Sequence, residues 1–293
     1  MIITKRIVFI LMIIPFSVFN QAPKTNDGKE AMYNIGIGAL IGGVGALINK
    51  NPEQNWSKVL LKGISQGALG GYLSFESKRI IRYAEPKKDY TLIWSSKILN
   101  ACGTSIKDNA ASNQDFWTKG HINIGFSRIE FSYLKKLKIN YKIMPVALFN
   151  TIWIASQSKF EFKSSIKTGQ IIFSNNKLSF FNSSAIATTF PGSIVLLEPI
   201  KTDFKTISHE IIHIYQANDF SPFDSFFNKP LKYINTKSNF LYQLNKFIYY
   251  DFRYLPEVLL YNFEMNRAKY YYDNKFEKEA GFYSNSFDAN MIK

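Results

Sequence analysis

Two histidines and a glutamate stand close together in the run His209-Glu210-Ile211-Ile212-His213. If this run is helical, His209 and His213 lie one turn apart on one face, so their imidazole rings can bind the same ion. Glu210 then points into the adjoining space, where its carboxylate can take a proton from water. Two imidazoles, one further protein ligand and an open fourth position make up a catalytic zinc site. The spacing therefore predicts bound Zn²⁺, with His209 and His213 as ligands and Glu210 as the catalytic base.

The segments around this run must hold its side chains in place. Thr206 and Ser208 are typical N-cap residues, and they predict a helix that begins just before His209. Upstream, residues 193–198 form a short apolar run that ends at a proline and predicts a buried strand. A competing interpretation stays open, in which both histidines are ordinary polar neighbours on a half-buried helix whose isoleucines form the core face.

The third zinc ligand has three candidates. Asp219 stands where metzincin-like enzymes have their third ligand, but Gln216 replaces the glycine with which those enzymes turn the chain. A proline opens a predicted helix over residues 256–271, and Glu257 in its first turn is already favoured there by the helix dipole. Glu264 lies in the middle of that helix on an aromatic face, where an unpaired carboxylate would be costly. We therefore predict Glu264 as the third ligand.

The pattern HEIIHxxQ, followed about fifty residues later by Phe-Glu-Met-Asn-Arg-Ala at 263–268, resembles the gluzincin metallopeptidases over about residues 193–272. The resemblance implies an α+β, zincin-like fold with a second helix that supplies Glu264, and hydrolysis of a peptide or protein substrate. It also implies that the strand 193–198 is a sheet edge to which an extended peptide can pair. Ala268 stands where gluzincins usually have an aspartate, so a hydrogen bond to a zinc-binding histidine would have to come from elsewhere.

The N-terminal segment has the pattern of a secretory signal peptide. Lys5 and Arg6 precede an apolar run over residues 7–19, and small and polar residues follow. This pattern predicts a signal peptide over residues 1–21 and an extracytoplasmic protein, periplasmic or secreted, although an uncleaved anchor stays open. Cys102 is the only cysteine, so an exported fold must be stable without an internal disulfide. The part of the chain before the zinc-ligand pattern resembles an uncharacterised family of exported bacterial proteins.

Two glycine-bearing apolar runs, at residues 35–48 and 59–75, follow the signal peptide. Their glycines recur at intervals of four residues, which lets two helices approach backbone to backbone, so we expect a helical hairpin within residues 22–85. The first run has 14 residues and the second contains Lys62 and Gln66, whereas a membrane span needs about 20 apolar residues. We therefore expect a hairpin that is membrane-associated or buried against protein.

Residues 86–293 are expected to form the zincin-like α+β domain. A helix is predicted over residues 92–115. Alternating patterns predict four strands, at residues 121–128, 138–143, 160–166 and 169–173. We expect His121 to be an exposed strand histidine rather than a ligand. The net charge of +14 comes from scattered Lys and Arg, which suits a basic surface attracted to an anionic membrane or polymer and disfavours a nucleic-acid site.

Two functions follow from these patterns. The first is a zinc-dependent peptidase in which Glu210 activates the water that attacks a peptide carbonyl. The second is a non-enzymatic, membrane-associated envelope protein whose zinc site is structural or degenerate. Metal analysis separates them, because a peptidase binds about one Zn²⁺ per chain and leaves one coordination position open.

Overall fold

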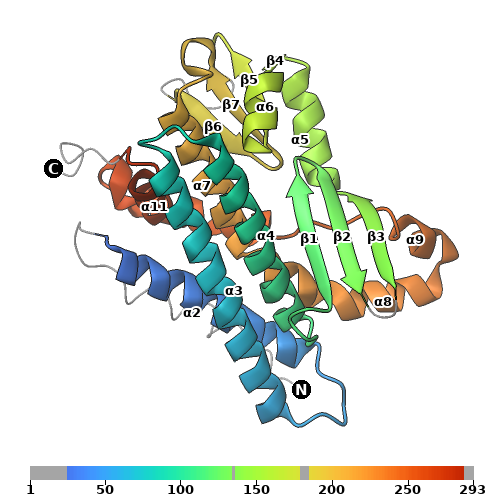
Figure 1. The fold of residues 1–293 in the computed structure, drawn as a ribbon. Coiled ribbons are helices and arrows are strands. Elements are labelled where there is room, and N and C mark those ends of the chain that lie inside the picture. The colour runs from blue at the N-terminus through green and yellow to red at the C-terminus, as the bar shows by residue number, and fades with distance from the viewer. Residues whose placement is uncertain (1–24, 134–135, 179–184, 287–293) are drawn as a thin grey trace.

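A computed structural model describes residues 25–133, 136–178 and 185–286 of the chain (Figure 1). Its mixture of helices with two small sheets confirms the predicted α+β class. The predicted signal peptide, residues 1–21, lies outside the described residues.

Three long helices form one layer of the molecule. They are α2 (Asp27–Ile48), α3 (Trp56–Ala84) and α4 (Tyr90–Ala111), and Asn26, Asn55 and Asp89 cap their N-termini. The two predicted glycine-bearing runs lie in α2 and α3, and they pack as closely as their spacing indicated. A Cβ atom placed on Gly42 would lie 2.7 Å from the carbonyl oxygen of Gly63, and one placed on Gly67 would overlap the carbonyl of Gly38.

Among the described residues, α2 is the one helix long and apolar enough to cross a membrane. Half of its most apolar 18-residue window is buried against the rest of the protein. Its neighbour α3 buries the charged side chain of Lys78 completely. Half-burial of this kind also occurs in the core helix of a soluble protein, so membrane association stays a prediction.

The first sheet is an antiparallel meander of β1 (Lys119–Ile124), β2 (Ser127–Tyr133) and β3 (Leu137–Ile143). His121 lies in β1, but the expectation that it is exposed is wrong, because only 5% of its surface is accessible. Its backbone N–H donates to the hydroxyl of Ser105 in α4. The meander therefore packs against α4 through β1.

The second sheet contains four strands in the order β4-β5-β7-β6. They are β4 (Lys159–Phe160), β5 (Ile171–Asn175), β6 (Ala187–Phe190) and β7 (Ser193–Leu197). The strands β5 and β7 are parallel, and the other pairs are antiparallel. The strand predicted from residues 193–198 is β7, which lies inside the sheet, so the expectation that it forms an edge is wrong. The edge on this side is β6.

Two short helices flank the second sheet, α5 (Pro145–Ala155) and α6 (Phe162–Thr168). The strand predicted over residues 160–166 is wrong beyond Phe160, because most of this segment is α6. Phe160 and Phe162 are both exposed, so their alternation does not mark a buried face. Gly169 ends α6 in the left-handed conformation (φ +67°), which glycine adopts without steric cost.

The C-terminal third of the described chain is helical. It comprises α7 (Phe204–Asp219), α8 (Asn228–Lys237), α9 (Asn239–Leu244), α10 (Tyr254–Arg267) and α11 (Lys275–Tyr283). The helix predicted over residues 256–271 is α10, which ends at Arg267. In the largest core cluster, residues of α7 meet residues of the second sheet and of α3, α4 and α11. Because α7 is central, its polar side chains are held by several neighbouring elements.

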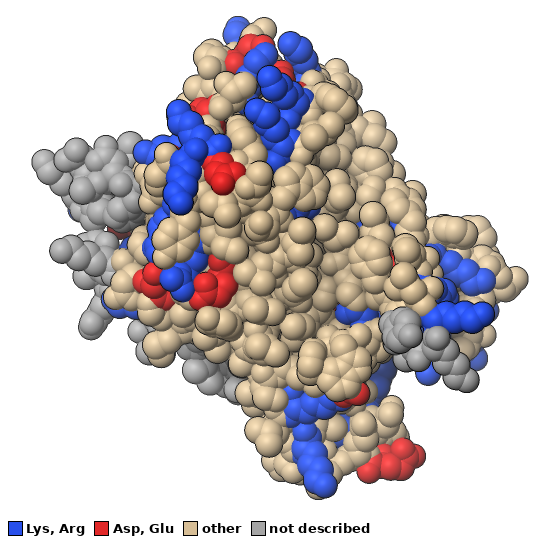
Figure 2. Space-filling model, viewed as in Figure 1, with Lys and Arg blue, Asp and Glu red and all other residues tan. Residues whose placement is uncertain are grey.

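Figure 2 shows one face of the molecule, on which Lys and Arg form several separate groups around a large neutral area. Acidic side chains are fewer on this face and lie mostly beside the basic ones. This arrangement agrees with the scattered basic residues of the sequence. It shows no continuous basic stripe on the face in view.

Candidate metal centre

The helix α7 carries the predicted zinc-binding residues. It begins at Phe204, because the carboxylate of Asp203 accepts a hydrogen bond from the N–H of Thr206 at 2.9 Å and caps the first turn. Thr206 and Ser208 are therefore inside the helix, and the prediction that they cap it is wrong. His209 consequently lies in the second turn, beyond the unpaired N–H groups of the helix start.

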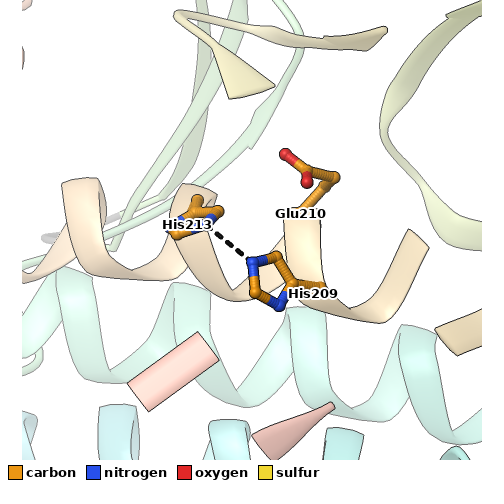
Figure 3. Close-up of side chains that lie close together, drawn as sticks. All are labelled: His209, Glu210 and His213. Carbon is orange, nitrogen blue, oxygen red and sulfur yellow. Dashed lines mark hydrogen bonds between the residues drawn. The ribbon is translucent and has the colours of Figure 1, made fainter. Parts of the chain in front are cut away.

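The two histidine rings converge from successive turns of α7, as the spacing predicted. The Nε2 atoms of His209 and His213 lie 3.1 Å apart (Figure 3). The side chain of Glu210 leaves the helix on a different side, above the two rings in this view. One carboxylate oxygen of Glu210 and one ring nitrogen of each histidine all lie within 4.8 Å of one another. The three residues of the motif can therefore act on one small volume.

A second carboxylate meets the rings, and it belongs to Glu277 of α11. Its Oε2 atom lies 3.1 Å from Nε2 of His209 and 3.4 Å from Nε2 of His213. The hydroxyl of Tyr261 donates to the other oxygen, Oε1, at 2.6 Å, and the hydroxyl of Tyr271 donates to Oε2. Glu277 is buried, with 4% of its surface accessible. The structure thus supplies a buried carboxylate that faces both rings.

Glu264, the predicted third ligand, lies elsewhere. It belongs to the last turns of α10, and within the described chain no hydrogen bond or ion pair joins it to either ring. Its charge instead contributes, after burial and the charges of three other acids, to raising the pKa of Tyr33 in α2. Because α10 ends at Arg267, the chain turns and returns as α11, and this return brings Glu277 to the rings. The carboxylate beside the two histidines in this structure is therefore that of Glu277, not that of Glu264.

Asp219, the metzincin-like candidate, is occupied by two lysines. Its Oδ2 lies 2.7 Å from Nζ of Lys78, and its Oδ1 lies 2.9 Å from Nζ of Lys107. All three side chains are buried, so the carboxylate neutralises charge inside the helical layer. Asp219 is a structural residue in this arrangement.

Glu257, the remaining candidate, lies near the centre without touching the rings. Burial raises the pKa of this carboxyl to about 7, although the nearby charges of His213 and Arg253 lower it. It is half-buried in the first turn of α10. Its position places a third carboxyl group, after those of Glu210 and Glu277, near the centre.

The outer nitrogen of each histidine ring has a hydrogen-bond partner. Nδ1 of His213 lies 2.8 Å from the amide oxygen of Gln216, which can only accept, so Nδ1 carries a proton and Nε2 is the nitrogen that faces His209 and Glu277. Nδ1 of His209 lies 3.1 Å from the hydroxyl of Ser286. Metal-binding histidines need such partners to fix the ring and its tautomer. Gln216 and Ser286 thus provide the ring contacts that the sequence pattern did not supply at Ala268.

Glu210 is held by the edge strand β6. The hydroxyl of Thr189 donates to its Oε2 atom at 2.7 Å, and Glu210 has 5% of its surface accessible. The carboxylate therefore has a fixed orientation and still has lone pairs available to accept a proton.

The charges of the centre favour a bound cation. Burial would raise the pKa of Glu277, but the charge of His213 and the hydrogen bonds of both rings outweigh it and hold that pKa well below its usual range. Burial would likewise lower the pKa of His213, but the charge of Glu277 and its hydrogen bond raise it to about 10. In this structure the proton on His213 therefore neutralises the negative charge of Glu277, as a bound cation would.

The donor set fits a zinc ion. Ligand atoms about 2.0 to 2.1 Å from a tetrahedral ion lie about 3.3 Å from one another. The three separations here are 3.1, 3.1 and 3.4 Å. Two neutral imidazoles and one carboxylate are also ligands that zinc accepts.

Comparison of the chain with protein-family models, with curated proteins and with solved structures finds no match. The assignment of the centre therefore depends on its own geometry.

Sequence reasoning missed Glu277, although Asn274-x-x-Glu277 is a typical helix start and could have indicated a short helix there.

Proposed function

We propose that the protein is a zinc-dependent peptidase, with His209, His213 and Glu277 as zinc ligands and Glu210 as the catalytic base. One observation carries this proposal. Three ligand atoms from two helices lie 3.1 to 3.4 Å from one another, beside a fourth side chain that can take a proton.

Glu210 is the proton carrier in this scheme. When bound, Zn²⁺ supplies Lewis acidity, which lowers the pKa of water and polarises the substrate carbonyl. Glu210 accepts the proton of the attacking water and then delivers it to the leaving nitrogen. Thr189 keeps the carboxylate pointed at the reacting atoms through its hydrogen bond to Oε2.

The edge strand β6 supports an extended peptide as the substrate. It pairs with β7 on one side, and within the described sheet its other side has no strand partner. Thr189 belongs to this strand and contacts Glu210. A peptide that adds to the edge by backbone hydrogen bonds would therefore pass beside the catalytic base.

The number of ligands separates this proposal from a structural zinc site. A structural site has four protein ligands, whereas a catalytic site keeps one position for water or substrate. The carboxylate of Glu210 approaches the rings but is engaged by Thr189. The centre would thus have three protein ligands and a base held by Thr189. This arrangement favours a hydrolase over the alternative, a non-enzymatic envelope protein with a structural or degenerate zinc site.

The test combines metal analysis with hydrolysis of an unfolded, fluorescently labelled protein. The purified protein should bind about one Zn²⁺ per chain and cleave the substrate. The variant Glu210→Gln should keep zinc and lose at least about 100-fold in rate, because general-base catalysis contributes that much. The variant His209→Ala should lose both zinc and activity, whereas the control Glu264→Gln should keep both. Full zinc content in His209→Ala, or an unchanged rate in Glu210→Gln, would contradict the proposal.

A further inference from the structure

A small polar cavity lies where α4, α7 and β1 meet. Its volume is about 30 Å³. Because one water molecule needs about 10 to 15 Å³ on this measure, the cavity has room for about two water-sized groups. Polar and charged side chains supply much of its lining, which includes Lys97, His121, Gln170, Ile214, Asn218 and Arg253.

Lys97 is the notable member of this lining. Its side chain is buried, with 5% of its surface accessible, and in the described chain it has no hydrogen bond or ion pair with an acid. Burial, with the charge of Arg253, lowers the pKa of Lys97 to about 7. Its aliphatic stem packs over Gly169, where a Cβ atom would lie 2.9 Å from Cδ of Lys97. The backbone of Gly169 thus makes room for a charged side chain that has no partner.

Other buried lysines of this protein are neutralised. Lys78 and Lys107 are each buried, and both form ion pairs with Asp219. Arg253, beside the cavity, is balanced by Asp251, with Nε lying 3.0 Å from Oδ1 and Nη2 lying 3.1 Å from Oδ2. Lys97 therefore has no acidic partner to neutralise its charge when it is protonated.

Four further polar atoms of the lining residues make no hydrogen bond in the described structure. They are the Nε2 atoms of Gln170 and His121, the Nε atom of Arg253 and the Oδ1 atom of Asn123, and all are buried. An unsatisfied buried polar atom costs about 1 to 3 kcal/mol, so such atoms usually face a ligand, an ion or water. Together with Lys97 these residues line one small volume that offers the amine of Lys97, the amide N–H of Gln170 and the unpaired acceptor Oδ1 of Asn123.

We propose that this cavity is a binding site for a small carboxylate, held by Lys97 and Gln170. A carboxylate carries one negative charge and two oxygen atoms, which match the single excess charge and the room for about two water-sized groups. A phosphate has four oxygens and needs more space. The unpaired amine of Lys97 disfavours a cation.

The cavity adjoins the proposed active site along α7. Ile214 lines the cavity and lies one helical turn after Glu210 on the same face. Gly192, at the turn between β6 and β7, also lines it. The carboxylate can therefore come from two sources, either a free small acid or the C-terminus of a peptide that lies along β6. The second source depends on the proposed peptidase function, whereas the first does not.

The test titrates the purified protein with sodium formate or acetate at constant ionic strength and follows heat release and melting temperature. Wild-type protein should show saturable binding of about one carboxylate per chain. The variants Lys97→Met and Lys97→Gln should bind at least about tenfold more weakly, because a hydrogen bond to a charged group contributes about 1.5 to 3 kcal/mol. Both remove an unpaired buried charge, so both are expected to fold, and their melting temperatures will verify it.

Two controls separate this site from the metal centre. Lys205→Met changes an exposed lysine of α7 and should leave carboxylate binding unchanged. His209→Ala should also leave it unchanged, so failure of the peptidase proposal would not remove this site. The absence of saturable binding by wild-type protein, or binding by both Lys97 variants as tight as that of wild type, would overturn the proposal.

A pair of tripeptides distinguishes the two sources. If a tripeptide with a free C-terminus competes with formate and its C-terminal amide does not, the site receives a peptide end. If formate binds and neither peptide competes, the site receives a free acid, and the proposal stands in that form. Binding of inorganic phosphate as tight as that of formate would contradict the assignment to a carboxylate.

Discussion

The Nε2 atom of His209 lies 3.1 Å from the Oε2 atom of Glu277, although 68 positions separate the two residues in the chain. This contact joins α7 to α11. The same helices are joined a second time, because Gln216 donates to Glu279 at 2.8 Å and Glu279 forms an ion pair with Lys78. Two separate connections therefore set the rotation of α11 and direct Glu277 to the rings.

We expect Glu277→Ala to lower zinc affinity by at least about 100-fold, because it removes one of three protein ligands. Glu264→Ala changes a half-buried acid of α10 and should leave the affinity within about twofold. Competition with a zinc-binding dye measures both values. If Glu264→Ala loses zinc and Glu277→Ala keeps it, the gluzincin-like assignment from the sequence is correct and Glu277 is not a ligand.

The close contact between α2 and α3 predicts the effect of adding one methyl group. Gly67→Ala should lower the free energy of unfolding by about 1 to 3 kcal/mol, because the new Cβ atom would overlap the backbone of Gly38. Gly36→Ala, in the same helix pair, meets no atom within 4 Å and should raise that free energy by up to about 1 kcal/mol. Urea unfolding of both variants measures the difference. Equal effects would show that the helices are not in close contact.

Lys97 predicts how stability depends on pH. Its pKa is about 7 in the folded protein and has an ordinary value of 10.5 in the unfolded chain. Between pH 7 and pH 10.5 the unfolded state binds more protons than the folded state, so the free energy of unfolding rises with pH through this window. The full cost of burying the charged amine is present only below pH 7, where Lys97 is protonated in both states. Lys97→Met removes this titration. Its advantage over wild type should be about 3 to 5 kcal/mol at pH 6 and should shrink towards pH 10.

Urea unfolding at pH 6, 8 and 10, in buffers without carboxylates, tests this prediction. Other titrating groups are common to both proteins and cancel in the comparison. A stability difference that stays constant from pH 6 to pH 10 would show that Lys97 does not titrate in this window.

Local patterns of the sequence predicted the parts of the structure that depend on local spacing. The four-residue interval between His209 and His213 brings their rings together on any helix, and the glycines at 42 and 67 permit a close helix pair wherever they meet. The alternation over residues 160–166 failed because its aromatic side chains face solvent. A period of two indicates a strand only when one of its faces is buried.

Contacts between distant segments could not be predicted in this way. Glu277 belongs to a helix of only nine residues, and its approach to His209 depends on how the chain returns after Arg267. Burial of His121 depends in the same way on Ser105 in another element. Asp219 is the opposite case. Its spacing from His209 suited a metal ligand, but its carboxylate forms ion pairs with two lysines from α3 and α4.

The position of α11 also sets an order of events during synthesis. The ribosome makes His209, Glu210 and His213 first, and 64 more residues must follow before Glu277 exists. A growing chain therefore has the pair of imidazoles but not the carboxylate of Glu277, and if Glu277 is the third zinc ligand, zinc binding at this stage would be weak. If the protein hydrolyses peptides, its activity can begin only once α11 has been made and has docked, so the unfinished chain cannot cleave itself or its neighbours.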